Sequence, residues 1–127
     1  MENIPDKLKY TKTHEWVKID GDVATVGITD HAQHELSDIV FLELPHVGRR
    51  VKVGEACAVV ESHKTASDIY SPLSGEITDA NSKLLNDLSI INSDPYGEGW
   101  FFKIKISNRD EVTRLLSAAD YKQIIAA

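Results

Sequence analysis

Cysteine is almost missing from this sequence: Cys57 is the only one, so no disulfide can form within the chain. Aromatic residues are also scarce, at 7% of the 127 residues. Basic residues are in the minority, with 14 Lys and Arg against 20 Asp and Glu, which gives a formal charge of −6. Because no basic stripe is available to neutralise a phosphate backbone, the sequence argues against nucleic-acid binding.

Long apolar runs are absent as well, and the longest falls far short of the ~18 residues that a membrane-spanning helix needs. Residues 1–6 show neither the basic start nor the apolar stretch of a signal peptide. We therefore expect a cytoplasmic protein, or a mitochondrial matrix protein if the chain is a mature organellar form. The length and the 42% hydrophobic content predict a single domain over residues 1–127, and we expect a monomer.

Short alternating segments, which are typical of β-strands, dominate the sequence. The pattern predicts strands at residues 16–19, 23–28, 39–44, 56–61, 67–70, 76–78 and 100–107. Gly21 marks a hairpin turn between the first two of these. Thr29 or Asp30 is suited to cap a short helix that ends near Leu36. Short strands combined with a few helices predict a β sandwich or flattened barrel with short peripheral helices.

The last part of the chain changes from strand to helical spacing. Trp100, Phe102, Ile104 and Ile106 alternate with Phe101, Lys103 and Lys105, which predicts a strand with one buried face. Apolar residues then recur at helical intervals, at Val112, Leu115, Leu116, Ala119 and Ile124. Asn108 and Glu111 have the spacing of a capping box. We therefore predict a C-terminal helical region over about 108–125.

Lys64 lies midway between two glycines, ten residues after Gly54 and eleven before Gly75. Two strand-like arms, 56–61 and 67–70, flank the polar link that contains it. A hairpin built from these arms would place Lys64 at its tip. There its amine would be exposed to a modifying enzyme, and acylation would turn a solvated cation into a neutral tether.

Two other groups of residues are candidates for chemistry, and we expect neither to be functional. His31 and His34 stand three apart on the predicted helix, but no nearby Cys or third His completes a metal site. Cys57 alternates within an apolar strand and is better explained as a small core residue than as a nucleophile. We therefore predict no metal site and no catalytic residue.

Segments along nearly the whole chain resemble the H proteins of the glycine cleavage system. The segment around the lysine, Val60-Glu61-Ser62-His63-Lys64-Thr65-Ala66-Ser67-Asp68-Ile69-Tyr70-Ser71-Pro72, is similar to the lipoyl-attachment segment of that family. The other similar segments are 8–10, 13–17, 26–33, 38–45 and 92–100. The chain departs from the family pattern in a few places: His63 stands where a small aliphatic residue is usual, Thr65 where Ala is usual, and Leu88-Ser89 where Pro-Glu is usual. Thr13 stands where Ser is also common.

This resemblance implies a barrel-sandwich hybrid fold of the lipoyl/biotinyl-carrier type, and a carrier rather than an enzyme. Lys64 would hold (R)-lipoate in covalent linkage as N6-lipoyllysine. The lipoyl group would accept the aminomethyl group of glycine at the P protein, which uses pyridoxal phosphate. It would present that group to the T protein for transfer to tetrahydrofolate, and the L protein, with FAD and NAD, would reoxidise it. A lipoate ligase or a lipoyl/octanoyl transferase would attach it.

The resemblance also implies roles for residues near the lysine. Thr13, Glu15 and Asp68 match positions that line a cleft for the loaded arm. The hairpin residues that the attaching enzyme would recognise are Glu61, Ser62, His63 and Thr65. A simpler interpretation of Thr13 and Glu15 is a strand-end cap and a salt bridge.

Four other functions have to be compared with this one. A biotin carrier typically has methionines beside its lysine, where this chain has His63 and Thr65. A lipoyl domain of a 2-oxoacid dehydrogenase complex typically has Asp-Lys-Ala at the tip. An enzyme with a Schiff-base lysine needs a desolvated amine, which a polar tip does not provide. The sequence hardly distinguishes a lipoate-relay protein of the same fold from a glycine cleavage carrier, so the relay function remains an alternative.

Overall fold

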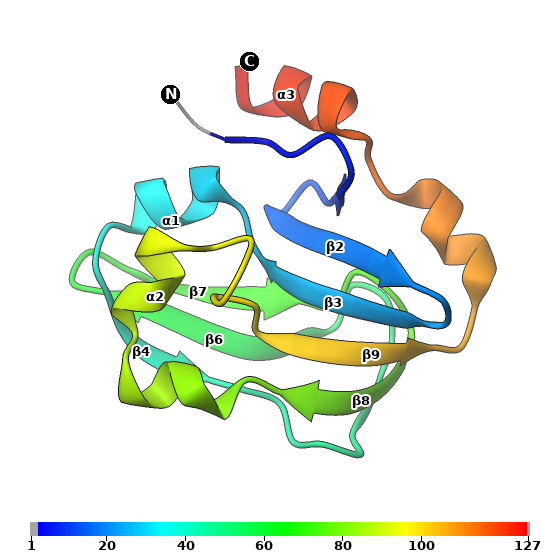
Figure 1. Ribbon diagram of the computed structural model, residues 1–127, viewed down its shortest axis with the longest axis horizontal. Helices are drawn as coiled ribbons and strands as arrows, with labels where there is room; N and C mark the ends of the chain where they lie inside the picture. Colours follow the sequence, from blue (N-terminus) through cyan, green and yellow to red (C-terminus); the bar gives the residue numbers. More distant parts are fainter. Residues whose placement is uncertain (1–2, 127) are drawn as a thin grey trace.

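The computed structural model describes residues 3–126, which form two antiparallel β-sheets with short helices around them (Figure 1). The larger sheet has the strand order β1-β2-β3-β9-β8-β5. Its strands are β1 (Lys9–Tyr10), β2 (Glu15–Asp20), β3 (Val23–Ile28), β5 (Arg50–Val51), β8 (Gly75–Ala80) and β9 (Phe102–Ile106). The smaller sheet has the order β4-β6-β7, with β4 (Ile39–Glu43), β6 (Ala56–Ser62) and β7 (Ala66–Tyr70).

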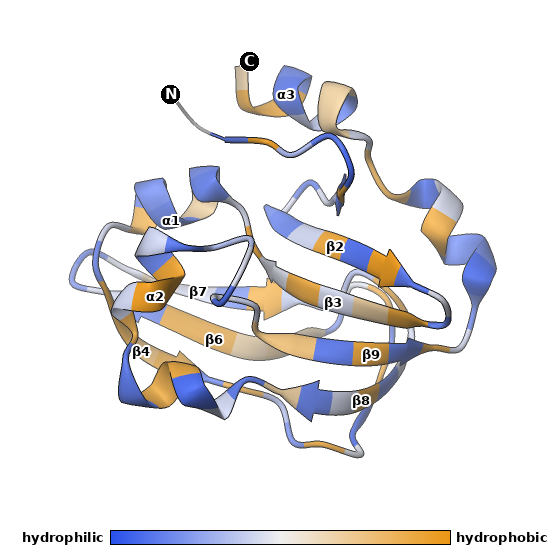
Figure 2. Cartoon of the chain, in the orientation of Figure 1, coloured by the Kyte–Doolittle hydropathy of each residue, from blue (hydrophilic) through white to orange (hydrophobic). Residues whose placement is uncertain are grey.

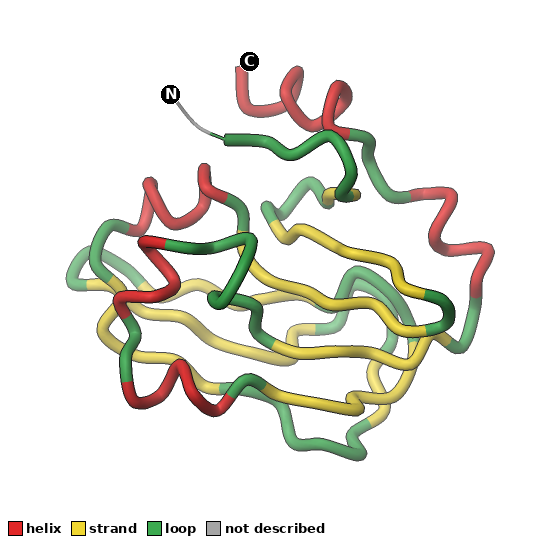
Figure 3. Tube along the Cα trace, in the orientation of Figure 1, coloured by secondary structure: helices red, strands yellow, loops and turns green. Residues whose placement is uncertain are grey.

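Residues 3–126 include five short helical segments. They lie at the periphery of the strands (Figure 3). They are α1 (Asp30–Leu36), η1 (Ser82–Asn86), α2 (Ser89–Ser93), η2 (Arg109–Arg114) and α3 (Ala118–Ala126), where η marks a 3-10 helix. Helices α1 and α2 lie at one end of the sheets, and α3 lies beside the N-terminal segment. Among residues 3–126, no helix has the length and apolar character that crossing a membrane requires.

Apolar side chains from both sheets form the main core, and much of strand β6 has the hydrophobic colour in Figure 2. Val26, Val60, Ile77 and Ile104 are fully buried there. Burial of this apolar area is the main favourable term in the stability of the fold. A second, smaller cluster lies under helix α3 and contains Tyr10, Trp16, Ala118 and Tyr121.

The predicted fold class is confirmed: the chain is mainly β, a barrel-sandwich hybrid with short helices and a C-terminal helix. The Gly21 hairpin is present, with Gly21 at φ 65° and Asp20 opposite Val23. Helix α1 begins where predicted, because Thr29 is its N-cap and its hydroxyl accepts a hydrogen bond from the Ala32 amide at 3.2 Å.

The strand around Trp100 differs from its prediction at its start: Trp100, expected on the buried face, precedes the strand and is half-buried. Phe102, Ile104 and Ile106 are buried as expected, but Phe101, which alternation placed on the opposite face, is also fully buried. The strand β9 begins only at Phe102, and the Phe101 amide donates to the Val26 carbonyl at 2.8 Å. Period-two alternation therefore does not apply at Phe101, because that residue precedes the regular strand.

The C-terminal region contains two helical segments where the pattern predicted one. Leu116 forms an isolated β-bridge with Tyr10, and this extended pairing separates η2 from α3. The buried residues of α3 are Ala118 and Tyr121, whereas Ala119 and Ile124 are exposed. The capping box is incomplete: Asn108 caps η2, but Glu111 accepts from the amide and hydroxyl of Ser74 instead of bonding back to residue 108.

Candidate functional site

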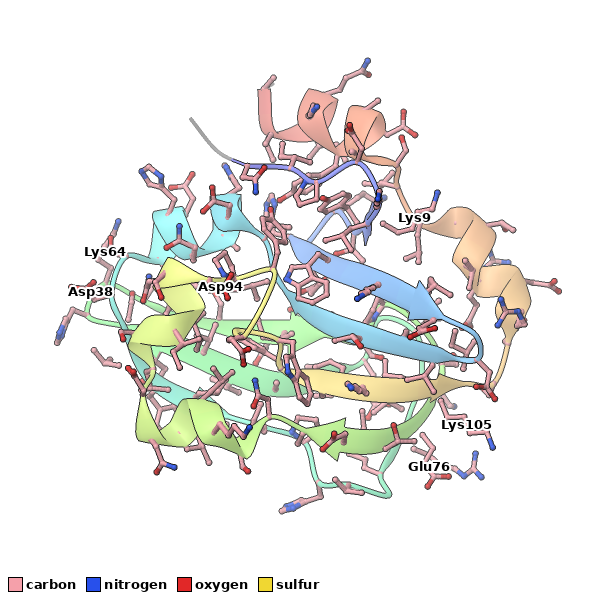
Figure 4. All side chains as sticks on the ribbon, viewed as in Figure 1. Lys9, Asp38, Lys64, Glu76, Asp94 and Lys105 are labelled. Carbon is pink, nitrogen blue, oxygen red and sulfur yellow. The ribbon has the colours of Figure 1, made fainter. Side chains whose placement is uncertain are left out.

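Lys64 lies in a tight turn that joins β6 to β7, at one edge of the molecule beside helix α1 (Figure 4). The two strands pair from Ala56 opposite Tyr70 up to Glu61 opposite Ala66. Beyond them the Ser62 amide donates to the Thr65 carbonyl at 2.9 Å, so the turn itself consists of His63 and Lys64. The antiparallel ladder thus fixes the position of the turn.

A buried serine shapes this turn from inside. The Ser62 side chain is only 9% exposed, and its oxygen accepts the Lys64 amide at 3.2 Å and the Thr65 amide at 3.3 Å. Hydroxyls that accept from backbone amides two and three residues ahead stabilise tight turns. His63, Lys64 and Thr65 are exposed and Glu61 is half-buried, so these four residues are accessible from solvent, whereas Ser62 contributes the shape of the turn.

The ammonium group of Lys64 contacts the end of helix α1. Its Nζ donates to the carbonyl oxygen of Glu35 at 3.1 Å. Carbonyls in the last turn of a helix lack intrahelical partners and attract cations. The unmodified lysine therefore lies against α1 and does not project straight into solvent.

The two glycines that flank the lysine segment serve different purposes. Gly54 adopts φ 83° and its amide donates to the Ser71 carbonyl at 2.8 Å, at the far end of the hairpin arm. Gly75 lies in β8, in the other sheet, opposite Ile106. A Cβ at position 75 would lie 2.0 Å from the Lys105 carbonyl oxygen, so Gly75 allows a close approach of two strands and does not end the hairpin.

A cavity of about 690 Å³ opens beside the lysine turn. Three parts of the chain line it: the loop 12–14, helix α1 with Ile28, and the hairpin from Thr65 to Tyr70. Its volume falls within the roughly 300–1,000 Å³ typical of small-molecule sites. The lining is mixed, with apolar side chains such as Leu36 and Ile69 and charged side chains such as Asp68.

The three predicted cleft residues occupy different places. Thr13 and Asp68 line the cavity, and both are exposed. Glu15 is fully buried behind it. The Glu15 carboxylate accepts hydrogen bonds from the hydroxyls of Thr11 and Thr13, and from the Tyr70 amide at 3.3 Å. Glu15 therefore holds the loop 11–13 against the hairpin and touches the cavity lining indirectly, through its bonds to Thr13 and Tyr70.

Burial raises the pKa of Glu15 above its ordinary value of 4.5, although the bonds from Thr11, Thr13 and Tyr70 oppose that rise. The folded protein therefore holds this proton more tightly than the unfolded chain does. This difference in proton affinity adds to the free energy of unfolding. The added stability is fully present at pH values below the ordinary pKa of Glu15 and is lost as the pH rises through the raised pKa of the folded protein.

We expect Glu15→Gln to remove this pH dependence, because the amide cannot ionise. Urea unfolding of both proteins from about pH 4 to about pH 8 measures it, over the range in which a perturbed carboxyl titrates. The wild-type free energy of unfolding should decline through this range more steeply than that of the variant. Glu43→Gln, at an exposed strand position, is the control, and profiles of equal slope for wild type and Glu15→Gln would contradict the expectation.

Two histidines that the sequence did not assign to the site also line the cavity. The His14 and His31 rings lie 4.8 Å apart, and His31 Nε2 lies 3.6 Å from the Glu35 carboxylate. His34 is exposed and does not converge with His31. Among the residues that the structure describes, no group of three metal-ligating side chains exists. Cys57 is buried in β6, and burial raises the pKa of its thiol to about 12, which fits the predicted core role.

Known proteins are similar to this chain over nearly its whole length. A family model described as glycine cleavage H-protein matches residues 8–127. A glycine cleavage system H protein of Methylacidiphilum infernorum is 56% identical over 97% of this chain and 96% of its own length. One of Alkalilimnicola ehrlichii is 51% identical over 99% and 98%. The crystal structure of a glycine cleavage system H protein from Mycobacterium marinum superposes with a TM-score of 0.90 at 40% identity, covering 98% of this chain and 100% of that one.

Proposed function

Since the chain belongs to the glycine cleavage H-protein family, we propose that it is a non-enzymatic carrier in which Lys64 holds a lipoyl group in amide linkage. The observation that supports this most is the position of Lys64, exposed at the end of a rigid hairpin and next to a cavity. In this proposal residues 1–127 act as one carrier domain.

The residues around Lys64 fit a lipoyl group. The amine is accessible to an attaching enzyme, and the turn is fixed by Ser62. The cavity begins at Thr65, one residue from the attachment point, and offers Ile28, Ala32, Leu36 and Ile69 to an aliphatic arm. A long apolar arm with a polar end matches this mixture of apolar walls and charged groups.

Lys64 would hold the lipoyl group, and the disulfide of that group would supply the redox and carrier chemistry that links the P, T and L proteins. The protein contributes position and shelter. A partner that binds the hairpin tip would meet His63, Lys64 and Thr65 first. A lipoate ligase or a lipoyl/octanoyl transferase would use the same residues together with Glu61.

Shelter has a chemical reason that involves the cavity. An aminomethyl group on sulfur is lost when the nitrogen lone pair expels the thiolate, and water then converts the released fragment to formaldehyde and ammonia. A protonated nitrogen has no such lone pair. Asp68 and Glu35 in the cavity favour the protonated amine, and the walls limit the access of water. Thr13 can present its oxygen to the same amine, while Glu15 supports Thr13 from behind.

Intact mass measurement with peptide mapping tests the attachment. We expect protein from a lipoate-replete host to carry a lipoyl increment on the peptide that contains Lys64. Peptides with other exposed lysines, such as Lys52, should be unmodified and serve as the internal control. A biotin increment at Lys64, or an unmodified Lys64 in a host that lipoylates its other carriers, would contradict the proposal.

A further inference from the structure

Tyr121 connects the C-terminal helix α3 to the walls of the cavity, although no residue of α3 lines it. Its side chain is fully buried. The hydroxyl lies 2.7 Å from the Thr29 hydroxyl and 2.8 Å from His14 Nδ1. Thr29 is the N-cap of α1 and His14 belongs to the loop 12–14, so one oxygen joins two of the three parts that form the cavity.

The His14 backbone needs such support. Its φ of 73° is uncommon for a residue with a side chain, and such conformations persist only where the surroundings impose them. The His14 amide donates to the Thr11 carbonyl at 3.2 Å, and its own carbonyl accepts from the Thr29 amide at 3.0 Å. These backbone bonds fix the loop, while the Tyr121 hydroxyl holds the direction of the imidazole.

The hydroxyl can serve His14 in either neutral form. If His14 carries its proton on Nδ1, the Tyr121 oxygen accepts that bond and Tyr121 donates to Thr29. If Nδ1 is unprotonated, Tyr121 donates to it and accepts from Thr29. A phenol that both donates and accepts therefore keeps His14 in place and links its tautomer to the cap of α1.

We propose that Tyr121 is a positioning residue for the cavity. By holding His14 and Thr29, it lets the C-terminal helix determine how long an amine-bearing arm stays in the cavity. This inference rests on the proposed lipoyl function, since the arm in question is the one on Lys64. The amine would meet a cavity wall that contains the His14 imidazole. Tyr121, on helix α3 behind that wall, sets the orientation of this imidazole.

Tyr121→Phe tests the hydroxyl without removing the ring, which stacks on Tyr10 at 4.8 Å. Tyr10→Phe is a closely matched control. Tyr10 is equally buried and lies in the same stack, but its hydroxyl donates to the Pro5 carbonyl at 2.6 Å, away from the cavity lining. Both variants lose one buried hydroxyl, so a general loss of stability affects both, and only Tyr121→Phe affects His14.

The first measurement is made on the unmodified protein. Imidazole nitrogen chemical shifts report the tautomer of His14, and a His14→Asn variant assigns the signal. We expect Tyr121→Phe to shift the His14 tautomer signals and Tyr10→Phe to leave them at their wild-type positions. Unchanged His14 signals in Tyr121→Phe would overturn the positioning role, whatever is attached to Lys64.

The second measurement follows retention on the lipoylated, reduced protein. Formaldehyde and ammonium condense with a lipoyl thiol to give the S-aminomethyl group and water, and intact mass then follows the reverse hydrolysis after dilution. We expect Tyr121→Phe to lose the group about fivefold faster than wild type, the scale of one net hydrogen bond, and Tyr10→Phe to match wild type. Equal rates for the two variants would overturn the inference.

Free dihydrolipoamide, treated in the same way, is the control that distinguishes a failure of the inference about Tyr121 from a failure of the proposed shelter. If wild type loses the group as fast as free dihydrolipoamide, the proposed shelter is wrong, and the retention role of Tyr121 is wrong with it. If wild type protects the group and Tyr121→Phe protects it equally, only the inference about Tyr121 is wrong.

Discussion

The Lys64→Arg variant is expected to fold normally, to carry no lipoyl increment and to give only background glycine cleavage with the P, T and L proteins. Arginine keeps the positive charge and can still donate to the Glu35 carbonyl. Its guanidinium stays protonated at any pH the protein tolerates and cannot form the amide. At an exposed position the change should alter the free energy of unfolding by no more than about 0.5 kcal/mol.

Lys52→Arg is the matched control, because Lys52 is also exposed and lies in a turn. It should retain both the increment and the activity. Mass spectrometry and a coupled assay of glycine-dependent NADH formation give the two readouts. Full activity in Lys64→Arg, or a lipoyl increment on another lysine of that variant, would show that the carrier residue has been misassigned.

Gly75→Ala is expected to cause a large loss of stability, roughly 3 kcal/mol. The new Cβ would lie 2.0 Å from the Lys105 carbonyl oxygen and 2.6 Å from the Ile104 side chain. The oxygen belongs to the backbone of β9, so relief requires the paired strands β8 and β9 to separate. Chemical denaturation should show a lower midpoint with a similar slope.

Gly48→Ala separates this clash from the ordinary cost of replacing glycine. Gly48 has φ 96° and nothing within 4 Å of its Cβ position, so only backbone strain opposes alanine there, at a cost of about 1 kcal/mol. A Gly75→Ala protein as stable as Gly48→Ala would mean that the two strands can move apart at little cost.

Local patterns were sufficient to predict the hairpin around Lys64. The arms alternate, the link between them is polar, and the two strands are neighbours in sequence, so pairing needs no distant contact. The same holds for the Thr29 cap, which depends on a residue three positions away. The role of Gly75 was beyond such reasoning, because its close neighbour, Lys105, lies thirty residues further along the chain.

The cavity could not be predicted from spacing, because it combines three separate segments. His14 and His31 face each other only through the packing of the loop 12–14 against α1. Tyr121 reaches the same place from α3, and no local pattern links residues 14, 29 and 121. The C-terminal helix was predicted as continuous for a similar reason, since the Leu116 bridge to Tyr10 is a tertiary pairing that overrides helical spacing.

The contact between Lys64 and the Glu35 carbonyl holds the unmodified lysine side chain against helix α1. While the amine is unmodified, the ammonium lies along α1, and under the proposed function an attaching enzyme would have to displace it before the reaction. Acylation would remove the charge of the nitrogen and with it the electrostatic attraction to the helix end, so the base of the arm would be free to move. The same reaction would take the formal charge of the chain from −6 to −7, because one ammonium would become a neutral amide. Lipoylated and unmodified protein would therefore differ in isoelectric point as well as in the freedom of this side chain.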